Sequence, residues 1–520
     1  MSTPNQATAL SFTLTGLDAH LVRVEVDSGR GLPIFRIVGL AETAVRESHV
    51  RVRAALRHLG VEVNEWVITV NLAPAYLRKY GSVFDLAIAA GTLGALGKIK
   101  SEALAASVLL GELSMTGEVR PVRGVLPSLL AARQGGLGHA IVAVENGHEA
   151  AAVTGLDVRV ARHIGEVVAH LNGERALPLA TPAQPGATWH GLVDLSEVHG
   201  QHGARGALEI AAAGAHNLLM MGPPGAGKTM LARRLPTILP PMTDDESLTV
   251  TAIHSVAGLL GSEDGLVRQR PFRAPHHTLS AAALLGGGEP VRPGEVSLAH
   301  HGVLFLDELL EFRRHVLEGL RQPLEDGVVT ISRARTRATF PALPLLVSAI
   351  NPCPCGYAGN LSTRRCECAP DRIRSYRARL SGPLLDRIDI HLVLPAVALD
   401  DLASTTPGES SAAVRERVMA ARSWQRHRAE IGETSTPYNA TLSKRDLERV
   451  AEPDARSHAL LRRAVQELGM SARGYVKVRR LARTIADLEG SDAVSYAHFV
   501  DALQARSLDR EPTIELARAG

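Results

Sequence analysis

The chain has 520 residues, of which 45% are hydrophobic, 21% are charged and only 3% are aromatic, and its formal net charge is +3. This length and composition are typical of a globular protein of about three domains, and so few aromatic side chains argue against a base-stacking sheet as a nucleic-acid surface. No apolar run approaches the ~20 residues of a membrane span, and the first residues lack the pattern of a secretion signal, so we expect a cytoplasmic protein.

In chain order, residues 1–175 form the first predicted domain, which is of mixed α/β type. Short apolar runs predict strands at residues 21–26, 34–38 and 67–70, and helical periodicity predicts helices at 44–59 and 126–133. Residues 176–198 are the predicted linker, because the segment 177–191 is rich in proline, alanine, threonine and glycine.

A phosphate-binding loop is predicted at residues 222–229. An apolar run at 218–221 precedes it as a buried strand, and residues 229–235 follow it as the first turns of a helix. Converging backbone N–H groups bind phosphates in such a loop, and only a glycine-rich turn brings them close enough, while the helix N-terminus favours the anion. The predicted nucleotide-binding residues of the loop are Gly222, Pro223, Pro224, Gly225, Ala226, Gly227, Lys228 and Thr229.

The end of this loop and a second apolar run predict the chemistry of the site. Lys228 is expected to reach the β- and γ-phosphates of ATP, and the Thr229 hydroxyl to ligate Mg²⁺. After the run at 303–306, Asp307 is expected to hold Mg²⁺ through water, and Glu308 to polarise the attacking water. Adjacent carboxylates at a strand end are unusual unless a cation or a reaction needs them. The sequence therefore predicts an ATPase with Mg²⁺ as its cofactor.

A third apolar run, at residues 345–350, ends in Asn351. Ligands of an open α/β sheet bind at the carboxyl ends of its strands, so Asn351 is expected near the γ-phosphate and the attacking water. The alternative is an asparagine that only turns the chain before Pro352.

All four cysteines of the chain lie in an insertion at residues 353–368: Cys353, Cys355, Cys366 and Cys368. Two pairs of thiolates can complete a tetrahedral zinc site, and a small loop without a core of its own gains stability from such a metal. Cytosolic cysteine clusters also bind metal more often than they form structural disulfides. We expect structural Zn²⁺, with redox-active or free thiols as the alternative.

Two histidine pairs, His276 with His277 and His300 with His301, also suggest metal ligands. Adjacent residues point in different directions on a helix or a strand, so such pairs rarely chelate one ion. We expect these histidines to serve in capping, core hydrogen bonding or loop positioning.

Two groups of arginines are candidates for nucleic-acid contact. The β-rich segment 327–340 reads as a hairpin, and at period two Arg333, Arg335 and Arg337 are expected to project from one face and to contact DNA phosphates. The alternative is a solvated hairpin edge that its charges keep from aggregating. The second group is expected either to follow DNA or to meet a neighbouring subunit's ATP, and it consists of Arg364, Arg365, Arg372, Arg374, Arg377 and Arg379.

Four motifs together resemble the magnesium-chelatase-like AAA+ proteins of the YifB/ComM family: PFRAPHH at 271–277, PGEVSLAH at 293–300, NPCPCG at 351–356 and SGPLLDRID at 381–389. The resemblance runs from about residue 10 to about residue 507. It implies an α/β architecture with a parallel-sheet AAA+ core at 199–397, a C-terminal helical lid at 398–520, for which residues 410–428 already read as a helix, and a Lon-protease-like domain at the N-terminus.

The resemblance also implies that a neighbouring subunit completes the ATP site. Arg387, in the Leu-Leu-Asp-Arg segment, matches the arginine finger, and Arg473 matches the sensor arginine of the lid. An arginine suits both roles because its charge is permanent and its planar fork can follow charge that spreads over the transferring phosphoryl group. In the same family the segment 251–288 is an insertion that faces the pore of a ring.

The Lon-like domain raises a peptidase hypothesis, because the protease uses a serine–lysine pair. Here Val83 takes the serine position and the lysine position falls on Ser128, while the neighbouring Ser82 lacks a base to accept its proton. We therefore interpret this domain as a non-catalytic binding or assembly module.

By this resemblance the protein is a homohexameric ATP-driven DNA motor, a helicase that migrates single-stranded or branched DNA during natural transformation and recombination, with recombination proteins as further partners. Two other classes remain open: a chelatase-type motor, and a chaperone-like or protease-associated AAA+ protein that remodels a protein partner.

Overall fold

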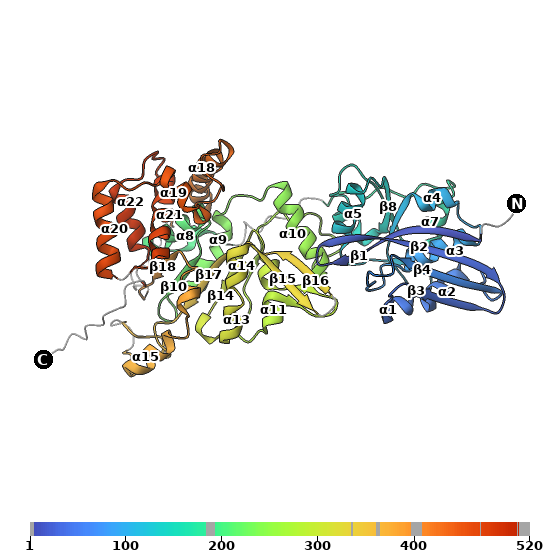
Figure 1. Cartoon of the computed structure of the whole chain (residues 1–520), viewed down its shortest axis with the longest axis horizontal. Helices are drawn as coiled ribbons and strands as arrows, with labels where there is room; N and C mark the ends of the chain where they lie inside the picture. The colour runs from blue at the N-terminus through green and yellow to red at the C-terminus, as the bar shows by residue number, and fades with distance from the viewer. Residues whose placement is uncertain are drawn as a thin grey trace.

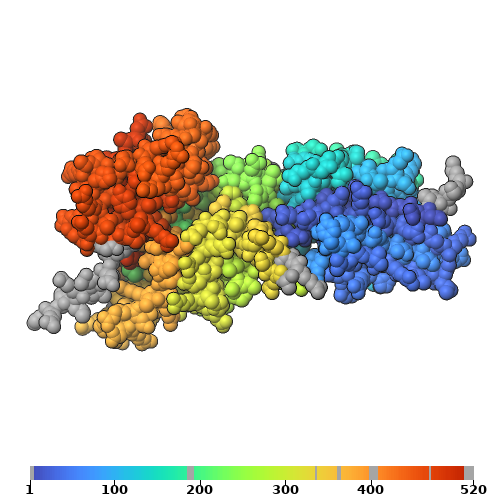
Figure 2. Space-filling model, in the orientation of Figure 1, coloured from blue at the N-terminus to red at the C-terminus, as the bar shows by residue number. Residues whose placement is uncertain are grey.

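The computed structural model describes residues 5–183, 193–333, 336–359, 365–396, 408–468, 470–506 and 508. The chain forms three parts in a row, with the N-terminal domain at one end, the ATPase sheet in the middle and the C-terminal helices at the other end (Figure 1). The molecule is therefore elongated, and its surface follows the order of the chain from blue to red (Figure 2).

The N-terminal domain is built on a seven-stranded mixed sheet with the strand order β3-β4-β2-β1-β5-β8-β9. Its longest strands, β1 and β2, pair antiparallel along their length. The predicted strands at 21–26, 34–38 and 67–70 are confirmed as parts of β2, β3 and β4. The strands are β1 (Gln6–Thr15), β2 (Asp18–Arg30), β3 (Ile34–Val38), β4 (Trp66–Ala73), β5 (Ser107–Leu110), β8 (His139–Ala143) and β9 (Asp157–Ala161), and the short β6 (Glu112–Leu113) pairs with β7 (Val119–Arg120).

Helices cover both faces of this sheet. Ala9 and Leu10 are neighbours on β1, and both are buried, but they belong to different hydrophobic clusters, so each face packs against its own set of helices. The predicted helix at 126–133 is confirmed as α5, whereas the one at 44–59 is divided into α1 and α2 at Glu47. The helices are α1 (Thr43–Arg46), α2 (Ser48–His58), α3 (Asp85–Ala95), α4 (Ser101–Ala105), α5 (Val125–Gln134), α6 (Gly147–Ala150) and α7 (Ile164–Leu171).

The predicted linker begins along the edge of this sheet. Val160 N donates to Pro178 O at 3.0 Å, and Ala180 N donates to Val158 O at 2.9 Å, so residues near 178–180 run beside β9. Residues 184–192 lie outside the described residues.

The ATPase sheet has five parallel strands in the order β11-β14-β17-β10-β18. The apolar runs at 218–221, 303–306 and 345–350 are confirmed as β10, β14 and β17. Alternate residues of β10 enter different hydrophobic clusters, so the sheet is buried on both faces, as in other parallel sheets. The strands are β10 (Leu218–Met221), β11 (Phe272–Arg273), β14 (Val303–Leu306), β17 (Leu345–Ile350) and β18 (Ile390–Val393).

The helices of this part flank the sheet, and two hairpins extend from it. The first hairpin consists of β12 (Gly286–Gly287) and β13 (Arg292–Pro293), and the second of β15 (Val328–Arg333) and β16 (Thr336–Pro341). The helices are α8 (His202–Gly214), α9 (Lys228–Ile238), α10 (Asp244–Ala257), α11 (Ala281–Leu285), α12 (Glu295–Leu298), α13 (Arg314–Glu318), α14 (Arg321–Asp326), α15 (Pro370–Arg377) and α16 (Gly382–Leu385).

The C-terminal part is helical. Ser410 caps the first helix, because its side chain accepts a hydrogen bond from Ala413 N. The helices are α18 (Ser411–Glu430), α19 (Lys444–Val450), α20 (Ala455–Leu468), α21 (Ala472–Leu488) and α22 (Tyr496–Gln504). Across the described ranges of the chain, no helix combines the length and the apolar character that crossing a membrane requires.

The N-terminal domain packs directly on the ATPase part. Gly124 N, just before α5, donates to Ser255 O of α10 at 3.2 Å. Phe340 of β16 is 0% exposed and shares a small hydrophobic cluster with Leu14 and Leu17 of the N-terminal domain. The hairpin β15–β16 therefore takes part in the contact between the two domains, as Figure 1 also shows.

Candidate active site

The phosphate-binding loop connects β10 to α9 at the carboxyl edge of the parallel sheet. Gly225 and Gly227 have φ values of 80° and 82°, a region that only glycine adopts freely. A Cβ on Gly222 would lie 2.8 Å from Leu394 O, so this position also has no room for a side chain. Because α9 begins at Lys228, its N-terminus points into the loop and favours an anion there.

Lys228 lies at the centre of this loop. Its Nζ donates to Gly222 O at 2.6 Å, to Pro223 O at 3.0 Å and to Asn351 Oδ1 at 3.1 Å. Burial lowers the pKa of Lys228, although the charges of Asp307 and Glu308 oppose this effect. β17 and β10 are neighbours in the sheet, and this contact connects Asn351 at the end of β17 with the loop that follows β10.

The expected Mg²⁺ ligands meet one another. The Thr229 hydroxyl donates to Asp307 Oδ2 at 2.8 Å, and Asp307 Oδ1 accepts from Glu308 N at 2.9 Å. Mg²⁺ prefers carboxylate, hydroxyl and water oxygens, so this donor set fits the ion.

Glu308 has a partner that the sequence did not predict. Its Oε2 lies 3.2 Å from His277 Nδ1, and its backbone has a φ of 51°, in the left-handed region. The His277 ring also lies over His276, with 4.1 Å between the ring centroids. Loop positioning was one of the roles expected for this histidine pair, and the group that His277 contacts is the carboxylate of Glu308. No signal in the sequence points to this contact, because the contact depends on β11, which precedes His277, lying next to β14 in the sheet.

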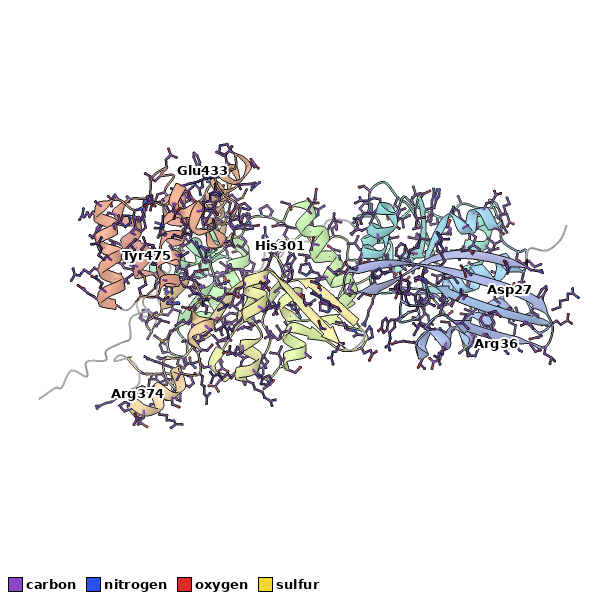
Figure 3. The ribbon with its side chains drawn as sticks, in the orientation of Figure 1. Asp27, Arg36, His301, Arg374, Glu433 and Tyr475 are labelled. Atoms are coloured by element: carbon purple, nitrogen blue, oxygen red, sulfur yellow. The ribbon has the colours of Figure 1, made fainter. Side chains whose placement is uncertain are left out.

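The second histidine pair serves the fold. Leu343 N donates to His300 Nδ1 at 3.0 Å, and burial together with the charge of His301 lowers the pKa of His300 to about 3. His301 lies near the centre of the molecule (Figure 3), where its Nδ1 is 3.6 Å from Glu246.

Arg387 and Arg473 lie at the opposite edge of the sheet from the phosphate-binding loop. Arg387 O accepts from Asn217 Nδ2 at 3.1 Å, and Asn217 immediately precedes β10, whereas the loop follows β10. The four residues of β10 separate the two edges by about 13 Å. Arg473 Nη1 lies 3.3 Å from Asp386 Oδ2 on the same side.

Both arginines line a cavity of about 640 Å³ between this edge and the lid. The Arg387 side chain is 10% exposed and pairs with Glu325, whereas Arg473 is 61% exposed. Neither of them is positioned to contact phosphates bound in the loop of its own chain.

The hairpin β15–β16 corrects one expectation. In this hairpin Ser332 pairs with Arg337, and Arg333 pairs with Thr336. Directly paired residues share a face and neighbours along a strand do not. Arg333 and Arg337 therefore project from opposite faces, and the expected single row of three arginines is wrong, because period two does not continue through a turn. Arg335 lies outside the described residues.

The two faces of this hairpin differ. The face of Arg333 also carries Phe340 and packs on the N-terminal domain, and the Arg333 guanidinium lies beside Gly287 of the first hairpin. Arg337 lies on the other face, and both Arg333 and Arg337 are exposed.

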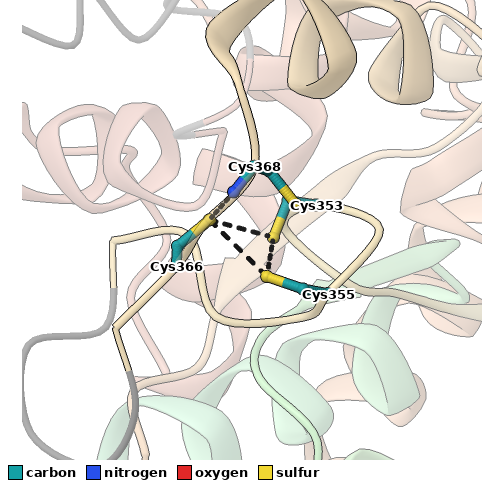
Figure 4. Close-up of side chains that lie close together, drawn as sticks. All are labelled: Cys353, Cys355, Cys366 and Cys368. Carbon is teal, nitrogen blue, oxygen red and sulfur yellow. Dashed lines mark hydrogen bonds between the residues drawn. The ribbon is translucent and has the colours of Figure 1, made fainter.

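The four cysteines lie together at the end of β17 (Figure 4). The Sγ–Sγ distances are 3.3 Å from Cys353 to Cys355, 3.7 Å from Cys353 to Cys366 and 3.5 Å from Cys355 to Cys366. A tetrahedral zinc site with Zn–S bonds of ~2.3 Å places its sulfur atoms about 3.8 Å apart, so this cluster is close to the size that zinc needs. Among the described residues, this is the one group of three or more possible metal ligands.

The thiols of the cluster differ in their acidity. A hydrogen bond from the backbone of Tyr357 lowers the pKa of Cys355 to about 6, and burial raises the pKa of Cys366 to about 12. Of these two thiols, Cys355 is the more acidic.

The second arginine group surrounds α15, beside this cluster. Arg377 Nε donates to Pro352 O at 3.0 Å, and Arg379 Nη1 donates to Leu310 O at 3.2 Å. Arg374 lies on the outer side of α15, away from the sheet (Figure 3), and Arg365 and Arg372 are also exposed. Arg364 lies outside the described residues.

The serines of the Lon-like domain have other partners. Ser82 Oγ donates to Glu112, and Ser128 Oγ donates to Gly124 O at 2.7 Å. The nearest lysine in sequence, Lys79, is buried and donates to Pro74 O. This arrangement agrees with the interpretation of a non-catalytic module.

A phosphate-binding loop, two carboxylates and an asparagine at the carboxyl edge of a parallel five-stranded sheet define a P-loop ATPase. Three family models match the chain: "Magnesium chelatase, subunit ChlI" over residues 194–402, "Subunit ChlI of Mg-chelatase" over 24–146 and "Magnesium chelatase, subunit ChlI C-terminal" over 408–506.

Curated relatives match nearly the whole chain. It is 43% identical over 501 residues to the competence protein ComM of Haemophilus influenzae, with 95% of this chain and 96% of the relative covered. It is 42% identical over 499 residues to the YifB protein of Escherichia coli, again with 95% and 96% covered. Lon protease 2 of Bacillus subtilis is 30% identical over 139 residues, which are 24% of this chain and 25% of the relative. The chain therefore belongs to the YifB/ComM family of magnesium-chelatase-like AAA+ ATPases.

Proposed function

We propose that this protein is an ATP-driven DNA motor that works in the cytoplasm as a homohexameric ring, a helicase that promotes branch migration during natural transformation and recombination. The observation that carries the proposal is the placement of Arg387 and Arg473 at the sheet edge opposite the phosphate-binding loop. In a ring of identical chains, this edge of one subunit can face the nucleotide of the next subunit.

The chemistry of the proposed motor follows from the residues of the site. The loop of residues 222–229 and Lys228 bind the phosphates, and Thr229 with Asp307 holds Mg²⁺, which neutralises charge on the phosphates when it is bound. Glu308 orients and polarises the attacking water, and Asn351 contacts the γ-phosphate. Arg387 of the neighbouring subunit stabilises the charge that develops on the transferring group, with Arg473 as the sensor of the lid.

DNA is the proposed substrate of this motor. Three features support it: the relative from Haemophilus influenzae is named a competence protein, the exposed Arg337 lies on the free face of the hairpin β15–β16, and α15 carries the exposed Arg372 and Arg374. Guanidinium groups at such positions bind backbone phosphates independently of base sequence. In this proposal Arg333 and Arg335 also contact DNA, and recombination proteins are further partners.

Structural Zn²⁺ is the proposed second metal, held by the four cysteines. Its support is the sulfur geometry described above together with the lack of a hydrophobic core among the described residues of the loop, 353–359 and 365–368. Elemental analysis should find about one equivalent of zinc per chain, and a Cys353→Ser, Cys355→Ser double variant should lack it. A metal-free, fully stable protein would favour free thiols.

A chelatase-type motor that remodels a protein partner is the second candidate, because the matching family models carry the name of magnesium chelatase. A chaperone-like motor belongs to the same class of alternatives. In either case ATP hydrolysis would respond to a protein and not to DNA.

The decisive experiment measures ATP hydrolysis without DNA and with single-stranded, duplex and branched DNA, using Glu308→Gln as the inactive control. We expect branched DNA to stimulate the rate most, and duplex DNA least. A rate that none of the three DNA forms changes, in a protein that hydrolyses ATP, would contradict the DNA motor and favour the protein-remodelling alternative.

A further inference from the structure

The cysteine cluster lies against the nucleotide site. The loop that carries its first two cysteines continues from Asn351, which contacts Lys228 with 3.1 Å between Oδ1 and Nζ. Gly356 of the same loop lies so close to Pro224 that a Cβ on this glycine would be 2.6 Å from Pro224 Cδ. The loop therefore contacts the nucleotide site at two points: Pro224 of the phosphate-binding loop and the asparagine next to Lys228.

The cluster also includes the two cysteines at the other end of the insertion at residues 353–368. Cys366 and Cys368 immediately precede α15, and α15 folds back so that Arg377 Nε donates to Pro352 O at 3.0 Å. Tyr376 of α15 is 6% exposed and packs in the hydrophobic cluster on one face of the ATPase sheet, where burial raises its pKa to about 12. The four sulfur atoms therefore connect residues 353–355, beside the nucleotide site, to α15, which Tyr376 anchors on the ATPase sheet.

Side-chain packing alone does little to hold this loop. Among its described residues, 353–359 and 365–368, Cys353 is the one hydrophobic side chain that is fully buried, at 0% exposure. Its Sγ accepts from Ala358 N at 3.3 Å, and Gly356 N donates to Cys353 O at 2.9 Å, which are contacts within the loop itself. A bound metal supplies the folding free energy that such a loop cannot obtain from a core.

We propose that the metal-bound cysteine cluster positions Asn351 for catalysis, through a loop that packs on Pro224, so that full ATP hydrolysis depends on a metal that lies outside the reacting atoms. This inference rests on the proposed zinc site. The cysteines act as positioning residues: they reach the phosphates only through the loop between Asn351 and Gly356, and Mg²⁺ keeps its separate place at Thr229 and Asp307.

The expected defect is selective. Loss of the metal releases Asn351, which acts on the γ-phosphate side of the site, and a misplacement of about 1 Å at a reacting centre costs up to about a hundredfold in rate. ADP lacks the γ-phosphate and binds through the backbone of the glycine loop and the N-terminus of α9. We therefore expect the hydrolysis rate without DNA to fall about ten- to hundredfold, while ADP affinity changes by less than about threefold.

The test compares full-length variants by zinc content, ADP affinity and hydrolysis rate without DNA. Cys366→Ser combined with Cys368→Ser removes two ligands and spares the buried Cys353, so zinc and hydrolysis should be lost together while ADP binding persists. Cys366→His keeps a zinc ligand and should retain both zinc and hydrolysis. Ser375→Ala, at an exposed position of α15, is the matched control and should change none of the three quantities.

A chelation experiment covers the case in which the double variant does not fold. The native protein is stripped of zinc by a chelator, returned to excess Mg²⁺ and assayed before and after Zn²⁺ is restored, with circular dichroism as the check on folding. Recovery of hydrolysis on adding Zn²⁺ supports the proposal. Zinc-free, folded protein that hydrolyses ATP at the native rate overturns the positioning role, and native protein without bound metal overturns the zinc site. Neither result bears on DNA as the substrate, because DNA is absent from the assay.

Discussion

The Thr229 hydroxyl donates a hydrogen bond of 2.8 Å to Asp307, and this contact joins the first turn of α9 to the end of β14. Two segments that are far apart in sequence thus form one oxygen-rich site beside Lys228. Lys228 is expected to serve nucleotide binding and Glu308 to serve hydrolysis, so substitutions of these two residues should affect different properties.

We expect Lys228→Ala to abolish nucleotide binding, because it removes the cation that meets the β- and γ-phosphates. Glu308→Gln should keep nucleotide binding and lower the hydrolysis rate by about 10²- to 10⁴-fold, since it leaves the glycine loop and the Mg²⁺ ligands intact. Binding of a fluorescent ATP analogue and phosphate release measure the two properties. A Glu308→Gln protein with the native rate would falsify the assignment of Glu308.

Arg387→Ala should lower hydrolysis by about 10³-fold without loss of ATP binding, because this arginine is proposed to act on the neighbouring subunit's nucleotide. Mixing Arg387→Ala chains with Lys228→Ala chains should restore part of the activity, since some interfaces then combine an intact loop with an intact arginine. Native mass spectrometry can verify that the rings have mixed. Mixed rings without any recovery would argue that Arg387 acts within its own chain.

The two described arginines of the hairpin β15–β16 should not be equivalent. Arg337→Ala removes a guanidinium from the free face, so the slope of log DNA affinity against log salt should become shallower by about 1. Arg333→Ala, on the face directed toward Gly287 and the N-terminal domain, should change this slope less. Fluorescence anisotropy over a salt series measures both. If neither slope changes in folded variants, the DNA contact lies elsewhere, and Arg372 and Arg374 of α15 are the next positions to test.

His300 should make the stability of the protein depend on pH. Its pKa in the folded state is about 3, whereas an unfolded histidine titrates near 6.5, so only the unfolded chain takes up this proton between these values. The free energy of unfolding should therefore fall as the pH falls below about 6.5, with a slope of up to about 1.4 kcal/mol per pH unit from this group. His300→Asn, whose amide oxygen can still accept from Leu343 N but does not titrate, should reduce the slope in urea unfolding measured between pH 7 and pH 5. An unchanged slope would show that other groups dominate.

Several elements could be predicted because their sequence patterns are unambiguous. β10, β14 and β17 are short apolar runs buried on both faces, and each is followed by residues of the site. The helix α3 is different: all of its residues are buried, so it has no polar face and no helical periodicity to recognise.

The remaining differences concern contacts between distant segments. The pairing of Arg333 with Thr336, which sets Arg333 and Arg337 on opposite faces, is a contact between two strands that the period-two pattern of the sequence does not reveal. The pairing of His277 with Glu308 depends on β11 lying next to β14, which is a property of the sheet order rather than of either motif. Likewise, the distance of Arg387 from its own chain's glycine loop follows only once β10 and β18 are known to be parallel neighbours.

The hydrophobic contact between the N-terminal domain and the hairpin β15–β16 bears on how the chain can be divided. Phe340 and Ala338, at 0% and 1% exposure, are covered partly by Leu14 and Leu17 of the other domain. An ATPase fragment cut within the linker would carry this apolar patch on its surface, where it would promote self-association. The N-terminal domain therefore covers apolar surface of the ATPase part that such a fragment would expose to solvent.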